Sequence, residues 1–118
     1  MKNTLKKAER LNSKKLIEEL FQKGSYFYFY PLKIFYLKEP ASTNHQVLIS
    51  VPKRTFKKAV ERNKLKRRIR EAYRLNKEKL AVSENLLLGY IYTSRKIENY
   101  NVIESGVIKA LTKLNNLD

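Results

Sequence analysis

The feature that most constrains this chain is a basic stretch between positions 53 and 70. It holds ten Lys or Arg residues and a single acid, Glu61. Ion pairing within the stretch cannot neutralise so many positive charges, so the stretch predicts a surface for a polyanion. The whole chain has the same sign, with 26 Lys and Arg against 11 Asp and Glu and a net charge of +15 over 118 residues. Nucleic acid is therefore the first partner to consider, and an anionic membrane is the second.

Apolar residues within and after the basic stretch recur at helical spacing. They predict the longest helix of the chain, from Thr55 or just after it to about Leu80. Arg62 and Lys66 project close to the apolar side of this helix, where an unpaired charge would be costly to bury. We therefore expect only the C-terminal part of the helix to pack, while its first turns overhang and present Arg62 and Lys66 to one large anion. The residues expected to face a sheet are Leu65, Ile69, Ala72 and Tyr73.

Together with six elements in the remaining sequence, this helix gives the order α-β-β-β-α-β-α, which indicates a two-layer α/β sandwich with one sheet. Ser13 is the expected N-cap of the first helix, and Gly24 is its expected stop. Pro31 divides an aromatic run into two strands, or into one strand with a break. We expect residues 1–12 to lie extended over the surface. The other expected elements are helices over 14–23 and 99–117 and strands over 26–30, 32–37, 46–51 and 86–93.

Composition excludes several other classes of protein. Without cysteine, disulfides and thiolate chemistry are impossible. The longest apolar run, residues 86–92, is far shorter than the roughly 20 residues of a transmembrane helix, and the basic N-terminus lacks the apolar region of a secretory signal. We expect one cytoplasmic domain over residues 1–118 that binds nucleic acid. The only Asp is Asp118 and the only histidine is His45, in an expected turn, so we expect no active site in the protein itself.

The stretch from Val51 to Arg74 resembles the signature of the bacterial ribonuclease P protein subunit. The hallmark of that family, Arg-Asn-Arg followed by Lys-Arg on a long helix, stands here as Arg62-Asn63-Lys64, then Lys66-Arg67 and Arg70. The likeness continues in Arg10-Leu11, in the Phe-x-x-Gly run that ends at Gly24, in the aromatic strand 32–37 and in residues 47–54. The chain departs from the family pattern in three places: Lys64 replaces an arginine, Ile17 replaces a frequent phenylalanine, and Lys57-Lys58 stand where Gly-Asn often precedes Ala-Val.

This resemblance implies a fold similar to domain 2 of ribosomal protein S5, with a four-stranded sheet and a left-handed βαβ crossover at the basic helix. It also implies a non-catalytic subunit of an endoribonuclease. In this family the RNA subunit removes the 5′ leader of precursor tRNA and leaves the mature 5′ end. The expected partners are ribonuclease P RNA and precursor tRNA, with one protein monomer per ribonucleoprotein and no membrane. The expected cofactor is Mg²⁺, held mainly by the RNA subunit and the substrate and not by a protein site.

The resemblance implies two RNA surfaces. One binds the RNA subunit, and the other is a cleft between the first helix and the sheet that holds the single-stranded leader. We expect the run from Tyr26 to Tyr30 to form core and edge strand and not an RNA surface. The residues implied for the RNA-subunit surface are Lys53, Arg54, Arg62, Asn63, Lys64, Lys66, Arg67, Arg68 and Arg70. Those implied for the leader cleft are Arg10, Ile17, Phe21, Lys33 and Phe35.

Other interpretations of the same residues stay open. The basic helix could belong to a structural RNA-binding protein of ribosomal type without a processing role, or to a peripheral membrane protein. It could also be an ordinary solvated helix face. Lys33 and Phe35 alternate with Leu32 and Ile34, which places them on a shared face that suits single-stranded nucleic acid. The same pattern also fits a partly buried phenylalanine beside a lysine that extends to water.

Overall fold

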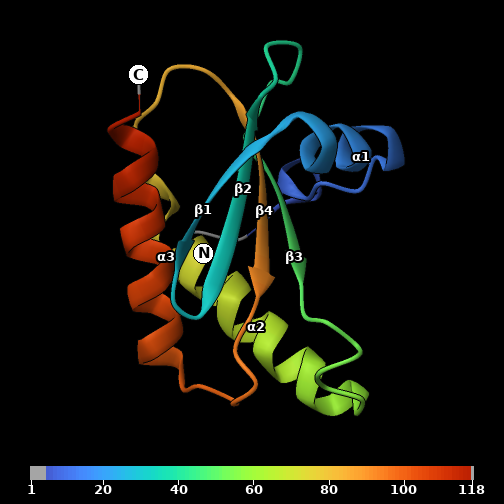
Figure 1. Cartoon of the computed structure of the whole chain (residues 1–118). Helices are drawn as coiled ribbons and strands as arrows, with labels where there is room; N and C mark the ends of the chain where they lie inside the picture. Colours follow the sequence, from blue (N-terminus) through green and yellow to red (C-terminus); the bar gives the residue numbers. More distant parts are fainter. Residues whose placement is uncertain (1–4, 118) are drawn as a thin grey trace.

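Four strands form one mixed sheet, and three helices cover its two faces (Figure 1). The structure, a computed structural model, describes residues 5–117. The expected order α-β-β-β-α-β-α is confirmed. The helices are α1 (Lys14–Lys23), α2 (Ala59–Asn76) and α3 (Tyr100–Asn115), with short 3-10 helices η1 (Lys7–Glu9) and η2 (Lys77–Lys79). The strands are β1 (Ser25–Phe29), β2 (Leu32–Lys38), β3 (Gln46–Ser50) and β4 (Leu86–Tyr92).

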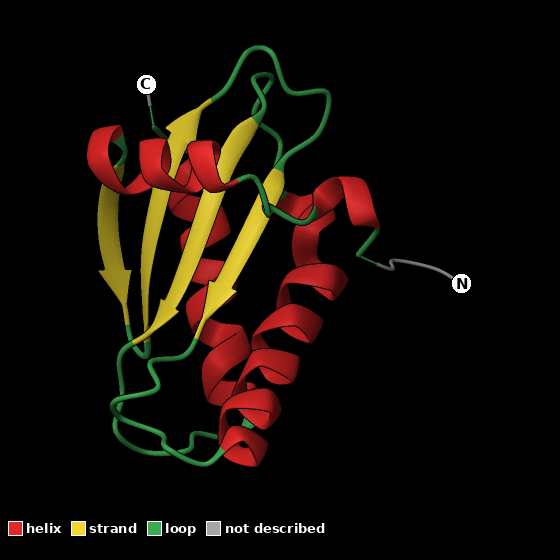
Figure 2. Cartoon of the chain, turned by 90° about the vertical axis from the view of Figure 1, so that its right-hand side faces the viewer, coloured by secondary structure: helices red, strands yellow, loops and turns green. Residues whose placement is uncertain are grey.

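The sheet order is β1-β2-β4-β3, so β1 and β3 are the edge strands. β1 and β2 form an antiparallel hairpin around Tyr30 and Pro31, β2 and β4 are antiparallel, and β3 and β4 are parallel. In Figure 1 β3 and β4 both run downward, β3 lies to the right of β4, and α2 lies behind the sheet, as the turned view of Figure 2 also shows. A path with these positions is a left-handed crossover, the rare hand that the resemblance implied.

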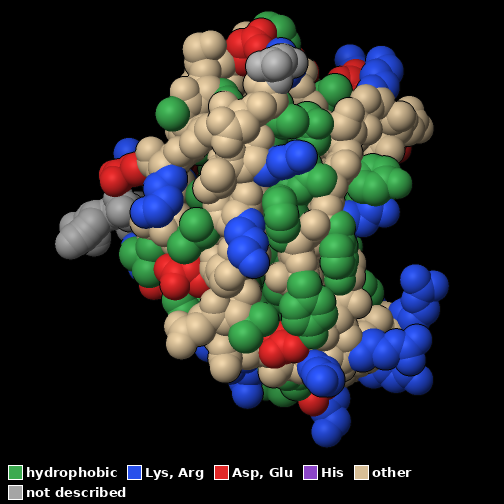
Figure 3. All heavy atoms as spheres, turned by 60° about the vertical axis from the view of Figure 1, so that its left-hand side comes forward, with side chains coloured by type: hydrophobic (Ala, Val, Ile, Leu, Met, Phe, Trp, Pro, Cys, Tyr) green, Lys and Arg blue, Asp and Glu red, His purple; other side chains and the backbone are tan. Residues whose placement is uncertain are grey.

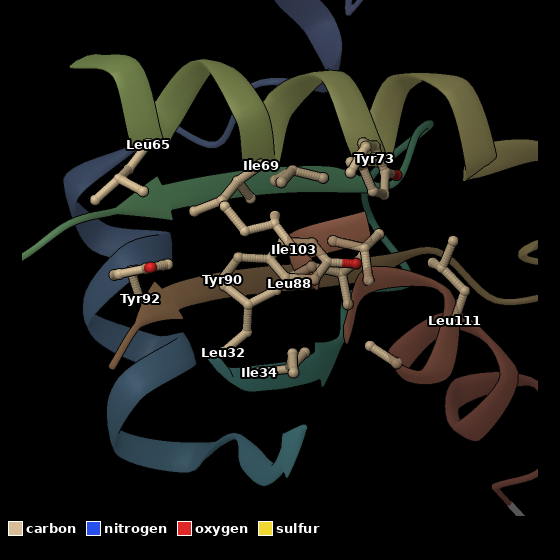
Figure 4. Close-up of a cluster of buried hydrophobic side chains, with 14 of the residues drawn as sticks. Leu32, Ile34, Leu65, Ile69, Tyr73, Leu88, Tyr90, Tyr92, Ile103 and Leu111 are labelled. Carbon is tan, nitrogen blue, oxygen red and sulfur yellow. The ribbon is translucent and has the colours of Figure 1, made fainter. Parts of the chain in front are cut away.

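The main core lies between one face of the sheet and helices α2 and α3 (Figure 4). Alternate strand residues point into it, because neighbouring side chains of a strand project to opposite faces. The expected inward side of α2 is confirmed, since all four of its residues are buried. The side chains labelled in Figure 4 are Leu32 and Ile34 of β2, Leu88, Tyr90 and Tyr92 of β4, Leu65, Ile69 and Tyr73 of α2, and Ile103 and Leu111 of α3.

Part of the other face of the sheet is covered by α1 and by Leu11 of the N-terminal segment. Leu20 is fully buried there against Leu87, and Leu16, Ile17 and Leu48 pack around them. The predicted ends of this helix are confirmed, because the Ser13 hydroxyl accepts a hydrogen bond from the Leu16 N–H and Gly24 follows the last turn. A side chain at Gly24 would collide with the carbonyl oxygens of Leu20 and Tyr36. Because Gly24 has no side chain, α1 can lie close to β2. The part of this face that α1 and Leu11 do not cover is open to solvent.

Two expectations about the chain path were wrong. The long helix begins at Ala59 instead of Thr55, because the N–H groups of Thr55 and Phe56 donate to the Pro52 carbonyl in a turn. It ends at Asn76, after which η2 carries the chain to Leu80. In the N-terminal segment, residues 7–9 form η1 and are not extended, and Leu5 and Leu11 are buried. The Leu11 N–H donates to the Val47 carbonyl at 2.9 Å, which ties this segment to the outer edge of β3. Residues 1–4 lie outside the described residues.

Candidate nucleic-acid interface

The N-terminal end of α2 projects beyond the sheet, as the sequence predicted (Figure 1). Val60 is 71% exposed, and the first fully buried residue of the helix is Leu65. Figure 3 shows Lys and Arg side chains gathered at this end of the molecule. The projecting turns therefore carry positive charge into solvent, where a large anion can reach it from several sides.

Arg62 makes a structural contact that the sequence did not predict. Its Nη1 donates to the carbonyl oxygens of Phe56 at 2.7 Å and Lys57 at 2.9 Å, and the side chain is half-buried. These hydrogen bonds give the Arg62 guanidinium polar partners beside the apolar side of the helix. Arg62 thus closes the turn that precedes α2 through its Nη1.

Replacing Arg62 by alanine is expected to lower the free energy of unfolding by about 1.5–3 kcal/mol, because two carbonyl groups lose a charged donor. Exposed Arg67 offers a matched control, for which a change within about 0.5 kcal/mol is expected. Urea unfolding of the two variants measures both values. Equal stability of the two variants would contradict the structural role of Arg62.

Arg68 is the second cation that the fold holds in place. Its Nη1 donates to the Glu98 carbonyl at 2.6 Å, which joins α2 to the loop between β4 and α3. Lys66 is half-buried. The other members of the predicted RNA-subunit surface point into solvent, and they are Lys53, Arg54, Asn63, Lys64, Arg67 and Arg70.

Arg54 lines a hollow of about 250 Å³ together with Thr55 and Arg95. Arg95 lies in the loop between β4 and α3, more than 40 residues from Arg54 in the chain, and it is also exposed. Two guanidinium groups beside a hydroxyl suit a phosphate group. The sequence does not single out Arg95, because nothing in its local surroundings marks it and only the fold brings the two loops together.

Three of the residues predicted for the leader cleft, Phe21, Lys33 and Phe35, lie together as an aromatic surface between α1 and the open face of the sheet. Phe21 of α1 and Phe35 of β2 meet edge to face, with ring centroids 4.8 Å apart. The Lys33 ammonium lies 5.2 Å from the Phe35 ring centroid. The Phe21 side chain is 38% exposed. Ile17 of α1 packs against the cluster formed by Leu20 and Leu87. Flat rings beside a cation suit the bases and phosphates of a single strand.

Tyr26 belongs to this surface, although sequence analysis assigned its run to core and edge strand. Its ring centroid lies 5.3 Å from that of Phe35, and the Lys33 ammonium lies 4.2 Å above its ring. Only Phe27 and Phe29 of the run pack towards the core. Successive residues of a strand point to opposite faces, and this alternation could have placed Tyr26 and Tyr28 on the face opposite to Phe27 and Phe29.

Arg10 lies away from the other predicted cleft residues. It pairs with Val47 at the outer edge of β3, so β4 and β3 separate it from Lys33 and Phe35 on β2. There it lines a hollow of about 400 Å³ with Arg70 of α2. The fold therefore places Arg10 beside the basic helix.

His45 and Glu9 each have a structural partner. The His45 Nδ1 accepts a hydrogen bond from the Leu86 N–H at 3.0 Å, and burial lowers the pKa of this side chain. The partly buried Glu9 pairs with Lys77 at 2.9 Å. Over residues 5–117 no three His, Asp or Glu side chains are grouped so that they could hold a metal ion. No helix in this range is both long and apolar enough to span a membrane.

Comparison with known proteins gives one consistent result. A family model described as Ribonuclease P matches residues 5–115. The ribonuclease P protein component of Porphyromonas gingivalis strain ATCC 33277 is 33% identical over 117 residues, which cover 93% of this chain and 85% of that protein. The component from Petrotoga mobilis is 30% identical over 118 residues, covering 94% of this chain and 95% of the relative.

Solved structures show the same fold. The RNase P protein of Thermotoga maritima superposes with a TM-score of 0.75 at 20% identity, over 93% of this chain and 98% of that one. A mutant RNase P protein of Staphylococcus aureus, described as defective in mRNA degradation activity, gives a TM-score of 0.78 at 22% identity. That match covers 91% of this chain and 88% of the other.

Proposed function

The chain belongs to the ribonuclease P protein family, and on this basis we propose that it binds ribonuclease P RNA and the 5′ leader of precursor tRNA. Membership makes it part of an endoribonuclease complex that processes tRNA. The finer proposal is that the protein assists removal of the leader and that the RNA subunit carries out the cleavage. One monomer would act in each ribonucleoprotein, in the cytoplasm.

The observation that carries this proposal is the presence of two separate surfaces suited to RNA. The projecting end of α2 presents exposed cations, while the open face of the sheet presents aromatic rings with one lysine among them. A basic helix alone would suit any folded RNA, because phosphate contacts carry no sequence information. An aromatic cleft adds affinity for an unpaired strand. A precursor tRNA differs from its product in having such a strand.

Magnesium is the proposed cofactor, held by the RNA and the substrate. Mg²⁺ prefers oxygen ligands and commonly takes them from phosphates, which the two RNA molecules supply in quantity. In this arrangement the projecting end of α2 would hold the RNA subunit and the aromatic surface would hold the leader, while Mg²⁺ held by the RNA would supply Lewis-acid chemistry for the cleavage.

The proposal is tested by reconstitution with ribonuclease P RNA from the same organism. At low magnesium concentration, adding the protein is expected to raise the cleavage rate of precursor tRNA at least about tenfold, because the protein supplies binding free energy of about 1.4 kcal/mol or more. A gel assay of 5′-labelled substrate measures the rate. If the protein binds that RNA and cleavage stays unchanged, the chain is a structural RNA-binding protein and the proposal fails.

A further inference from the structure

We propose that Tyr26 and Tyr28 of β1, here called the tyrosine track, extend the aromatic cleft into a longer binding surface for single-stranded RNA. Each ring would stack with one base. The inference rests on the proposed function, since it assigns further nucleotides of the same strand to the same face of the sheet.

The register of the hairpin places the tyrosine track beside the cleft. Tyr26 pairs with Phe35 and Tyr28 pairs with Lys33, and directly opposed residues of antiparallel strands share a face. Within residues 5–117 the sheet ends at β1, so no further strand pairs with its outer edge. The track is thus continuous with the surface formed by Phe21, Phe35 and Lys33.

The two rings of the track are unusually open to solvent. Tyr26 is 59% exposed and Tyr28 is 54% exposed. Large apolar groups that stay exposed together mark binding surfaces more often than single exposed residues do.

Charge along the track favours RNA over a second copy of the chain. At one end the Lys33 ammonium lies over the Tyr26 ring. At the other end Arg95 and Lys96 are both exposed, and the Lys96 N–H donates to the Ser94 hydroxyl at 3.0 Å. A single strand offers bases to the rings and phosphates to these cations. Two copies with a net charge of +15 each would repel one another.

Tyr30 marks the end of the track and has a different role. Its hydroxyl donates to the Glu98 carboxylate and lies 2.9 Å from the Ser94 hydroxyl, and the bond to Glu98 raises the pKa of Tyr30. This side chain holds the loop that carries Arg95 and Lys96. Glu98 is the acidic residue of that loop, and its carboxylate accepts the hydrogen bond from the Tyr30 hydroxyl. The stacking surface therefore consists of Tyr26 and Tyr28.

The test measures binding of labelled oligouridylates of about 4 and about 10 nucleotides to the full chain over a series of salt concentrations. Tyr28→Ala is expected to weaken binding of the longer strand about tenfold and that of the shorter strand less. Tyr28→Phe keeps the ring and is expected to bind like the wild type. The slope of log Kd against log salt should stay unchanged in Tyr28→Ala, whereas Lys33→Ala should reduce it by about 0.7.

Three outcomes would overturn the inference, and they are distinguishable from failure of the proposed function. If Tyr28→Ala binds the longer strand like the wild type while Phe21→Leu weakens both lengths, the cleft stands without the track. If the wild type sediments as a dimer that Tyr28→Ala dissociates, the tyrosines serve self-association. If Tyr28→Phe loses as much affinity as Tyr28→Ala, the hydroxyl and not stacking is responsible. A wild type that binds neither strand contradicts the proposed leader cleft itself.

Discussion

Replacing Lys64, Arg67 and Arg70 together by alanine is expected to weaken binding to ribonuclease P RNA about 100-fold. The three side chains are exposed and follow one another at helical spacing of three, which places them along one side of α2. No ion pair within residues 5–117 involves any of them. At about 1 kcal/mol for each side chain removed, the weakening sums to about 3 kcal/mol.

Filter binding over a salt series measures this effect and its origin. The slope of log K against log salt should become shallower by about 2.7, or about 0.9 for each phosphate that the variant no longer neutralises. A matched variant, with Lys79, Lys109 and Lys113 replaced by alanine, removes the same charge from exposed positions in η2 and α3. An equal decrease of affinity in both variants would mean that net charge alone, and not the α2 surface, determines binding.

Replacing Phe21 by alanine and Phe35 by leucine is expected to reduce the preference for precursor over mature tRNA at least tenfold. Each stacked base contributes about 1–3 kcal/mol, and mature tRNA has no leader to bind. Leucine at position 35 preserves part of the packing against α1, so the fold should hold. The measurement compares the Kd of the reconstituted enzyme for the two tRNAs.

The control for this variant is Phe27→Leu, on the same sheet. Phe27 packs on the α3 side of β1, away from the cleft. It should leave the preference for precursor tRNA unchanged even if it lowers the free energy of unfolding. A variant of Phe21 and Phe35 that weakens binding of both tRNAs equally would contradict a leader-binding role for this cleft.

Local chemistry made the ends of α1 predictable. Ser13 caps the helix through a bond to a residue three positions away, and Gly24 is placed where the next strand begins. The buried side of α2 was predictable for a related reason, because 3.6 residues per turn bring Leu65 and Ile69 to one face whatever they pack against. The aromatic pair Phe21 and Phe35 came from the resemblance, which aligned two elements that the sequence alone could not place together.

The sequence by itself thus determined the order of elements, the basic helix and its apolar side, and the likeness to a known family. Tertiary structure alone decided which cationic side chains are free of contacts within the protein and where they lie. Arg68 meets the carbonyl of Glu98, 30 residues away in the chain, and Arg10 lies at the far edge of the sheet from Lys33. The pairing of β1 with β2 decided that Tyr26 and Tyr28 face the cleft. Such contacts depend on the packing of distant segments, and periodicity within one segment carries no information about the partner it meets.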